Sequence, residues 1–495
     1  MTETGTTPII FGSGSEDFRQ AEWLAIVLAG EWRHDYSTSL WHHWNGFRWE
    51  PDRTGQLLKT IADKAAEGIK EAELETTRKS LLKLYNVPPL KRALEALATF
   101  EGYGTDGDDW DTDPYLIGCE NGVVDLRTGA MAGMGPESLV TKTTGQHYIA
   151  LDLSSGVHAA MEQRCPKFWH HLLQWTSDDW GVENEDMAAF LLQWFGTALF
   201  GFTPEQKFLV MTGIGRNGKG TLKNAVMAAT GDYGMQSDQN LYMRSKNGAA
   251  RSDGPRADLI KLKGARVGFF SEPEGGRFNE ELLKNHTGQD VINARALFSN
   301  IVSQWKATHS ITFLVNDLPA VDDVGPSMIE RVLVADFRLR WEGSNPNPDR
   351  RPNTRLEDEL AAEAEGILAL LVWAAGVWYK RYSAGQLGLI LPERVIESSK
   401  HFIERNDPVV TCIEEAFEVG DGLTCAGQVA YDVYLQWHAR SGADDEPVSM
   451  VRFTQALEKR GFGRYRSAAT RGWKGLKPLG VMALAERGDQ GDDDE

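Results

Sequence analysis

A glycine-rich turn between an apolar run and a helix-forming run restricts the fold of this chain more than any other pattern. Residues 207–221 read KFLVMTGIGRNGKGT, in which four residues separate Gly213 from Gly218 and Lys219 follows directly. In such a turn, backbone N–H groups converge on anionic oxygens and the lysine adds a mobile positive charge. The segment predicts a phosphate-binding loop between a strand and a helix over residues 221–230. An ordinary glycine turn is the alternative, and the flanking strand and helix patterns disfavour it.

One position of this loop departs from the usual pattern. Gly220 stands where a serine or threonine normally ligates magnesium, and Thr221 follows one place later. We therefore expect ATP with Mg²⁺ as the ligand, with Thr221 as a candidate metal ligand. The expected nucleotide-binding residues are Gly213, Ile214, Gly215, Arg216, Asn217, Gly218, Lys219, Gly220 and Thr221.

Bulk properties limit the partners of the chain. Its 495 residues carry a net charge of −19, so a contact with DNA requires a local basic patch. The four cysteines are scattered, which is typical of a reducing compartment. The first residues lack the layout of a signal peptide, and the most apolar stretch, residues 366–379, is short for a bilayer span. We expect a cytoplasmic protein without membrane contact.

The pattern along the chain predicts several domains. We expect a disordered N-terminus at 1–18, an accessory domain at 19–165, an ATPase core with a helical lead-in at 166–341, a linker and helical segment at 342–404, a DNA-binding domain at 405–480 and an acidic tail at 481–495. Alternating strands and helices from 207 to about 340 predict a parallel sheet. Single helices are expected over 56–73, 77–100 and 356–382, strands within 40–50, and a hairpin turn at Asn121-Gly122.

Polar residues end or begin three later apolar runs, and each is a candidate for nucleotide chemistry. Glu272 ends the run 266–272 and is the candidate carboxylate for magnesium or for orienting water, with Glu274 as a weaker second. Asn316 follows the run 311–315, where an amide can reach the γ-phosphate. Arg331 opens the run 331–337 and is either a strand-edge charge or an arginine finger for a neighbouring subunit.

The order of these motifs resembles superfamily 3 helicases of the phage, plasmid and poxvirus primase-helicase type. The resemblance rests on GRNGKGT, the acid after a strand, the set Lys284, Gly288, Asp290 and Arg295, the strand ending in N-x-L-P, and the arginine strand. Residues 116–145 also look like the segment that precedes the helicase in this family. The resemblance implies an AAA+-like α/β core with Lys219 on the phosphates, Thr221 and Glu272 at magnesium, Asn316 as the sensor and Arg331 as the finger acting in trans.

Related helicases carry a hairpin that enters the channel of the ring, and residues 298–309 match its place here. The resemblance makes Lys306 and His309 candidates for contact with the DNA backbone. Ordinary solvated loop charges are an equally simple interpretation of these two residues.

The C-terminal region carries a local excess of positive charge. Residues 448–477 hold eight basic residues against one acidic residue. A helix at 449–460, a glycine turn and a basic strand-turn-strand predict a winged helix that binds DNA, although a merely soluble basic face is the alternative. The candidate contacts are Arg452, Lys459, Arg460, Arg464, Arg466, Arg471 and Lys474.

Together these patterns predict an ATP-dependent DNA helicase that forms a ring in phage- or plasmid-type replication. The resemblance implies a homo-hexamer on single-stranded and forked DNA in the host cytoplasm, working with a separate primase or replication initiator. Two alternatives stay open at this point. One is a DNA-bound assembly or initiation platform that uses ATP without unwinding, and the other is a small-molecule P-loop kinase.

Overall fold

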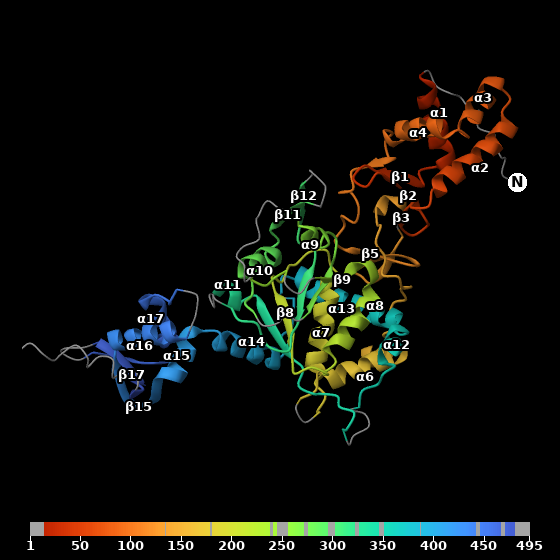
Figure 1. The fold of residues 1–495 in the computed structure, drawn as a ribbon. Coiled ribbons are helices and arrows are strands. Elements are labelled where there is room, and N and C mark those ends of the chain that lie inside the picture. Colours follow the sequence, from red (N-terminus) through yellow and green to blue (C-terminus); the bar gives the residue numbers. More distant parts are fainter. Residues whose placement is uncertain are drawn as a thin grey trace, which may run out of the picture.

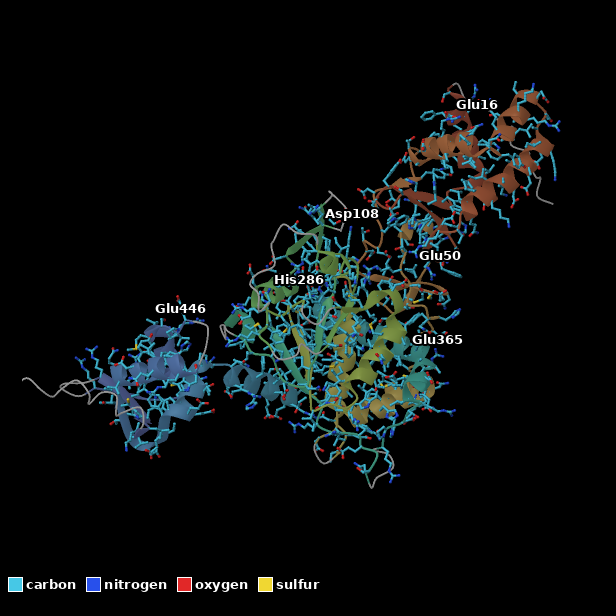
Figure 2. All side chains as sticks on the ribbon, in the orientation of Figure 1. Glu16, Glu50, Asp108, His286, Glu365 and Glu446 are labelled. Carbon is cyan, nitrogen blue, oxygen red and sulfur yellow. The ribbon has the colours of Figure 1, made fainter. Side chains whose placement is uncertain are left out.

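The computed structural model describes three lobes along the chain (Figure 1). It covers residues 14–133, 135–178, 181–237, 241–244, 256–271, 276–295, 302–321, 326–345, 351–386, 388–441, 446–466 and 471–480. Figure 2 places Glu16 in the N-terminal lobe, His286 in the central lobe and Glu446 in the C-terminal lobe. Among the described helices, none combines the length and the apolar character that crossing a membrane requires.

The N-terminal lobe packs helices over a small mixed sheet of order β3-β2-β1-β4. Its apolar cluster runs from Ala21 to Tyr103. The elements are α1 (Glu16–Leu28), β1 (Trp32–Asp35), β2 (Leu40–Trp44), β3 (Trp49–Pro51), α2 (Gln56–Glu71), α3 (Glu75–Lys83), α4 (Val87–Ala98) and β4 (Gly104–Thr105).

Two expectations for this lobe are corrected. Helix α1 already begins at Glu16, inside the segment predicted to be disordered. The single helix predicted over 77–100 is two helices, because α4 starts with Pro88 and Pro89 in its first turn. Proline lacks the N–H that a continuing helix needs, and its ring clashes with the preceding turn.

The central lobe is built on a five-stranded parallel sheet of order β14-β8-β13-β10-β9. Alternate residues of one strand enter different cores: Leu209 and Met211 of β8 join one apolar cluster, whereas Phe208 and Val210 join the other. The predicted parallel sheet is confirmed. Its strands are β8 (Phe208–Thr212), β9 (Gly234–Ser237), β10 (Val267–Ser271), β13 (Ser310–Leu314) and β14 (Val332–Asp336).

Helices cover both faces of this sheet (Figure 1). The larger cluster contains residues of α5 (Val157–Arg164), α6 (Pro166–Trp175), α7 (Glu185–Ala198), α8 (Lys219–Thr230), α12 (Leu356–Ala361) and α13 (Ala364–Ser383). The second contains residues of α9 (Ala257–Ile260), α10 (Glu280–Thr287), the hairpin β11 (Val291–Arg295) and β12 (Val302–Lys306), α11 (Pro326–Ile329) and α14 (Glu393–Arg405). Helix α13 was expected in a separate segment after the ATPase core, but it is buried beside α7 and is therefore part of this core.

A small sheet of order β5-β6-β7 joins the central lobe, although we expected it within the accessory domain. Ile117 and Val124 belong to the same apolar cluster as the parallel sheet. The hydroxyl of Tyr233, in the turn η2 (Gly231–Tyr233), accepts a 2.8 Å hydrogen bond from the Gly118 N–H. The boundary between cores therefore falls between Tyr103 and Leu116 and not at 165. The elements are β5 (Leu116–Cys119), β6 (Gly122–Asp125), β7 (Ala130–Ala132) and η1 (Pro136–Ser138). The predicted hairpin is present, but its turn is Glu120-Asn121 and not Asn121-Gly122, because Gly122 already pairs with Cys119 as the first residue of β6.

The C-terminal lobe has its own apolar cluster, from Val409 to Leu476. Three helices pack on an antiparallel sheet of order β15-β17-β16. In chain order the elements of this lobe are α15 (Pro408–Ala416), β15 (Phe417–Ala426), α16 (Gly427–Arg440), α17 (Met450–Lys459), β16 (Arg464–Arg466) and β17 (Arg471–Pro478). Helix α14 leads from the central lobe into this lobe (Figure 1).

Candidate nucleotide-binding site

The glycine-rich loop leaves β8 in a backbone conformation that only glycine adopts easily. Gly213, Gly215 and Gly218 have φ values of 145°, 76° and 90°. A Cβ on Gly213 would lie 2.3 Å from the carbonyl oxygen of Phe337, and a Cβ on Gly218 would lie 2.2 Å from Cδ1 of Trp175. Both glycines of the motif are therefore required by positive φ and by close packing.

Lys219 is the first residue of α8 and folds back across this loop. Its side chain is buried, and Nζ donates a 2.6 Å hydrogen bond to the carbonyl oxygen of Gly213. The N-terminus of α8, a helix of 12 residues, lies at the same place. A helix N-terminus and a lysine together favour an anion, because both contribute positive potential.

Buried Asn217 fixes the loop to the neighbouring strand. Its Nδ2 donates a 3.2 Å hydrogen bond to the carbonyl oxygen of Phe337, just after β14. The Phe337 N–H in turn donates to the Thr212 carbonyl at 2.8 Å, and the Trp341 N–H donates to the Arg216 carbonyl at 2.8 Å. The sequence placed Asn217 among the nucleotide ligands, and in this structure its side chain holds the loop in shape.

A cavity of about 550 Å³ lies against the loop. The carboxyl ends of parallel strands meet at one edge of a sheet, and this edge is where α/β proteins bind ligands. Accordingly Ser271 of β10 and Asn316, after β13, line the cavity together with Thr221. Glu272 directly follows Ser271 and lies, with Glu274, outside the described residues. The remaining lining residues are Gly215, Arg216, Asn217, Gly218, Lys219, Gly220, Lys223, Asn224, Leu314 and Glu357.

Asn316 is placed beside the loop by the register of β13 against β8. The Val315 N–H donates to the Met211 carbonyl at 3.0 Å, and the Thr212 hydroxyl donates to the Asn316 carbonyl at 3.3 Å. The predicted sensor and the phosphate loop thus meet in one cavity, as the parallel strand order requires.

Arg331 lies at the amino ends of the strands, directly before β14, whereas the cavity lies at their carboxyl ends. Its Nη1 donates to the Ser327 carbonyl at 2.7 Å, and its Nε donates to the Thr287 hydroxyl at 3.2 Å. Strand β14 has five residues, which span roughly 16 Å at about 3.3 Å per residue. The structure therefore does not bring Arg331 together with Lys219 in the same chain.

Two residues of the site escaped the sequence prediction. The ring of Trp175 packs against Gly218 of the loop, and Glu357 of α12 lines the cavity. Both come from helices far from the loop in sequence, and an aromatic residue in an apolar helix or an acid in an acidic run carries no local signal of this role.

A hairpin is present, but it is formed by β11 and β12 over 291–306 and therefore begins before the predicted stretch 298–309, and one of the two candidate DNA contacts is wrong. Lys306 ends β12 opposite Val291 and is exposed. His309 has an exposed fraction of 0%, and its Nε2 forms a 2.8 Å hydrogen bond with the Tyr242 hydroxyl. That hydroxyl also bonds Nδ1 of His286 at 2.7 Å. His309 is a core residue because its imidazole completes this buried polar cluster.

The basic residues of the C-terminal lobe differ in their surroundings. Arg460 pairs with Asp407 at 2.8 Å, and Arg464 pairs with Glu458 at 2.6 Å while its guanidinium lies over the ring of Trp473. Trp473 itself is buried. The others are exposed on α17 and on the hairpin of β16 and β17: Arg452, Lys459, Arg466, Arg471 and Lys474.

The parallel sheet, the glycine-rich loop after β8 and the cavity at the carboxyl ends of the strands define an α/β protein with a core of the P-loop type. Residues 21–178 match the family model described as D5 N terminal like. The chain therefore carries a domain of this family, and the predicted resemblance to primase-helicases is confirmed. The matched segment spans the N-terminal lobe, the small sheet and the helices up to α6.

Two viral proteins are similar to this chain. A "putative helicase" of Acanthamoeba polyphaga mimivirus is 27% identical over 310 residues, which is 60% of this chain and 30% of the relative. A "putative primase" of African swine fever virus (isolate Tick/Malawi/Lil 20-1/1983) is 26% identical over 190 residues, which is 38% of this chain and 18% of the relative. The chain thus spans less than a third of either relative.

Among solved structures, the apo C-terminal region of NrS-1 aligns over 94% of this chain and all of its own length. The TM-score is 0.47 and the sequence identity is 10%.

Proposed function

We propose that this chain is an ATP-dependent DNA helicase with an AAA+-like core that forms a ring and unwinds DNA during replication of the phage or plasmid type. The observation that carries the proposal is the meeting of Lys219, Thr221 and Asn316 in one cavity at the carboxyl ends of β8 and β13. This is the chemistry that a triphosphate needs: a cationic cradle, a hydroxyl for the metal and an amide for the γ-phosphate. The helicase and primase names of the viral relatives support the same class.

Each residue of the site has a proposed role. Lys219 stabilises the charge of the β- and γ-phosphates after exchanging its bond to the Gly213 carbonyl for the ligand. Thr221 and Glu272 hold Mg²⁺, which supplies charge neutralisation across the phosphates when bound. Asn316 orients the attacking water or the γ-phosphate.

The position of Arg331 supports a ring. Because Arg331 lies at the amino end of β14, its guanidinium cannot reach the phosphates of a nucleotide bound to the same chain. A neighbouring copy that presents its phosphate loop to this edge would receive the arginine in its active site, where it offsets transition-state charge. A closed ring of identical subunits, as the predicted hexamer requires, has this kind of head-to-tail interface.

DNA contacts are proposed at two places. The β11–β12 hairpin with Lys306 at its base would face the channel. The C-terminal lobe would act as a winged helix, and the order of α17 followed by the β16–β17 hairpin supports this, because the sequence predicted a helix and a strand-turn-strand there. Exposed Arg466 and Arg471 pair across its terminal hairpin and would contact phosphates.

Purified protein with a forked DNA substrate tests the proposal. We expect ATP hydrolysis stimulated by single-stranded DNA, and strand displacement that requires ATP and is lost in Lys219→Ala. Hydrolysis stimulated by DNA without displacement would favour the assembly platform instead. Hydrolysis indifferent to DNA would point to a kinase-like activity and contradict the helicase.

A further inference from the structure

One face of α8, the helix that follows the glycine-rich loop, lines the cavity on the side away from the loop. Gly220, Thr221 and Asn224 share this face of α8, because residues three and four apart in a helix lie above one another. A Cβ added to Gly220 would meet nothing within 4 Å. The helix surface between Lys219 and Asn224 is therefore open to a ligand.

Glu357 closes the far end of this open face. The Asn224 side chain donates a 3.0 Å hydrogen bond from Nδ2 to Oε1 of Glu357, and both residues line the cavity. The amide thereby fixes one carboxylate oxygen of Glu357. The second oxygen and the remaining lone pairs keep the capacity to accept hydrogen bonds.

Helix α12 is oriented by contacts on its other side. Glu359 pairs with Lys167 at 2.9 Å and accepts a hydrogen bond from Asn353 at 3.3 Å. Residues two apart on a helix do not share a face, so this anchoring turns Glu357 away from α6 and toward α8. The placement of the Glu357 carboxylate in the cavity thus follows from packing at both sides of α12.

A carboxylate at this position does not suit a phosphate. Asn224 lies five residues after Lys219, which is about 7.5 Å along a helix axis at about 1.5 Å per residue. A triphosphate that is held at Lys219 and runs along this open face of α8 would bring its sugar to the Asn224 end. Carboxylates are repelled by phosphate oxygens but accept hydrogen bonds from sugar hydroxyls, as acidic residues of dinucleotide-binding folds do with a ribose 2′-OH.

We propose that Glu357, positioned by Asn224, accepts a hydrogen bond from a ribose hydroxyl and makes the site selective for ribonucleoside triphosphates. This inference rests on the proposed nucleotide binding and adds the recognition of the sugar. The substrate class is thereby narrowed to ribonucleotides over 2′- or 3′-deoxyribonucleotides.

Equilibrium binding of ATP, 2′-deoxy-ATP and 3′-deoxy-ATP to the full chain tests the assignment. A hydrogen bond to a charged acceptor predicts that ATP binds about tenfold or more tightly than one of the deoxy analogues. Glu357→Ala should weaken ATP binding by the same factor and leave the affinity for that deoxy analogue unchanged. Glu357→Gln, which keeps a neutral acceptor, should give an intermediate ratio.

Asp358→Asn is the matched control, because Asp358 is exposed on the same helix and does not line the cavity. This variant should keep the parent's ratio of affinities for ATP and the deoxy analogue. The thermal unfolding midpoint of each variant shows whether it is folded. Equal affinity of the parent for ATP and both deoxy analogues would overturn the ribose assignment alone. A Glu357→Ala variant that hydrolyses ATP slowly but keeps the parent's ratio of affinities for ATP and the deoxy analogue would also overturn the assignment. That result would favour a role of Glu357 in holding the metal ion or the attacking water. Failure of the parent to bind any of the nucleotides would instead contradict the proposed function.

Discussion

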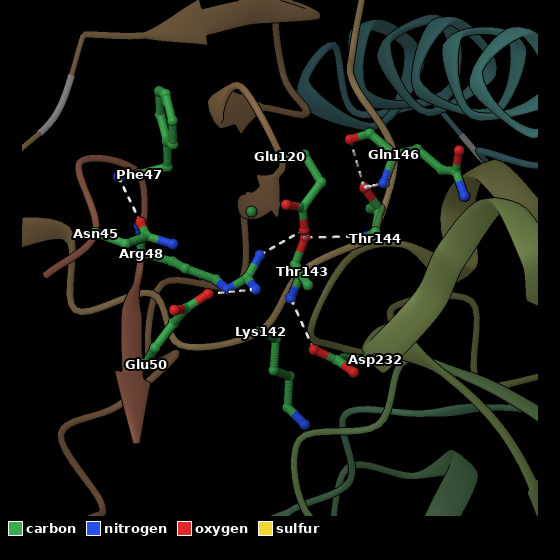
Figure 3. A network of polar contacts seen from close by, with 12 residues as sticks. Asn45, Phe47, Arg48, Glu50, Glu120, Lys142, Thr143, Thr144, Gln146 and Asp232 are labelled. Carbon is green, nitrogen blue, oxygen red and sulfur yellow. Dashed lines mark hydrogen bonds and ion pairs between the residues drawn. The ribbon is translucent and has the colours of Figure 1, made fainter. Parts of the chain in front are cut away.

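Arg48, in the turn between β2 and β3, donates a 2.6 Å hydrogen bond from Nη1 to Oε1 of Glu120 in the central lobe (Figure 3). Glu120 also accepts from the Thr143 hydroxyl at 2.9 Å, and the Thr143 N–H donates to Asp232 at 3.0 Å. Asp232 lies just after α8, so a polar chain joins the N-terminal lobe to the end of the phosphate-loop helix. The hydrogen bond from Arg48 lowers the pKa of Glu120, which means that the interaction stabilises the charged carboxylate.

Arg48→Ala should therefore loosen the N-terminal lobe. The pair is partly exposed, so we expect a loss on the order of 1 kcal/mol. Limited proteolysis should cut faster between residues 104 and 115, where the two cores meet. Arg53→Ala, a change of an exposed arginine in the same lobe, is the control and should cleave at the parent rate. Equal cleavage of all three proteins would show that Arg48 does not hold the lobes together.

The two glycines around Lys219 should respond in opposite ways. Gly218→Ala places a Cβ against Trp175 at a positive φ, so we expect destabilisation of at least about 1 kcal/mol and loss of ATP binding. A Cβ on Gly220 meets no protein atom within 4 Å and Gly220 lies in a helix, so Gly220→Ala should stabilise the fold by up to about 1 kcal/mol. Thermal unfolding and nucleotide titration measure both. A Gly218→Ala protein that binds ATP normally would contradict the described loop.

The buried cluster of Tyr242, His286 and His309 should make the central lobe sensitive to acid. Burial lowers the pKa of His286 to about 4 and the pKa of His309 to about 3. The unfolded chain, with histidine pKa values of about 6.5, binds more protons than the folded chain below that pH. Stability is therefore fully present above pH 6.5 or so and falls as the pH drops toward the folded values, by up to about tenfold in the unfolding constant per site and pH unit.

Hydrogen exchange of the amides in β12 and β13 between pH 7.5 and 5.0, corrected for intrinsic rates, measures this loss. His309→Gln removes one titrating group while keeping a polar side chain, so it should lower stability at pH 7.5 and flatten the pH dependence. His401→Gln alters an exposed histidine of α14 and should keep the parent slope. An unchanged slope in His309→Gln would exclude His309 as a source of acid sensitivity.

Mixing two inactive variants should restore activity if Arg331 acts in trans. Lys219→Ala and Arg331→Ala each disable one side of the proposed interface. A mixed ring contains some interfaces with an intact lysine on one subunit and an intact arginine on the next, so ATP hydrolysis should exceed that of either variant alone. Absence of any gain, with mixed oligomers demonstrated by differential tagging, would contradict the finger assignment.

Two arginines of the C-terminal lobe should separate stability from DNA binding. Arg460 pairs with Asp407, whose side chain caps α15 by accepting from the Val409 N–H. Arg460→Ala should destabilise the lobe by about 1 kcal/mol. Exposed Arg466 should matter only for phosphate contact, so Arg466→Ala should weaken DNA binding and reduce the salt slope by about 0.9. Binding titrations over a salt series test both, and a DNA affinity unaffected by Arg466→Ala would remove it from the interface.

Several elements could be predicted because their signals are local. The glycine-rich loop after β8, the hairpin of β5 and β6 and the strands β8, β10, β13 and β14 follow from short patterns of glycine, turn residues and β-branched or aromatic runs. Asn316 was placed correctly beside the loop because parallel strands bring their carboxyl ends to one edge. The break before α4 was also local, and Pro88-Pro89 was the signal that should have predicted it.

The amino-acid sequence by itself determined that a glycine-rich loop follows β8, which residues form it and which strands surround it, because glycine conformation and hydrophobic periodicity act over a few residues. Only the tertiary structure decided that Trp175 supports Gly218, that Glu357 enters the cavity, that His309 is buried and that residues 116–148 belong to the central core. These outcomes depend on which distant helices and strands pack together. Burial and hydrogen bonding between such segments depend on the whole chain, so no local pattern encodes them.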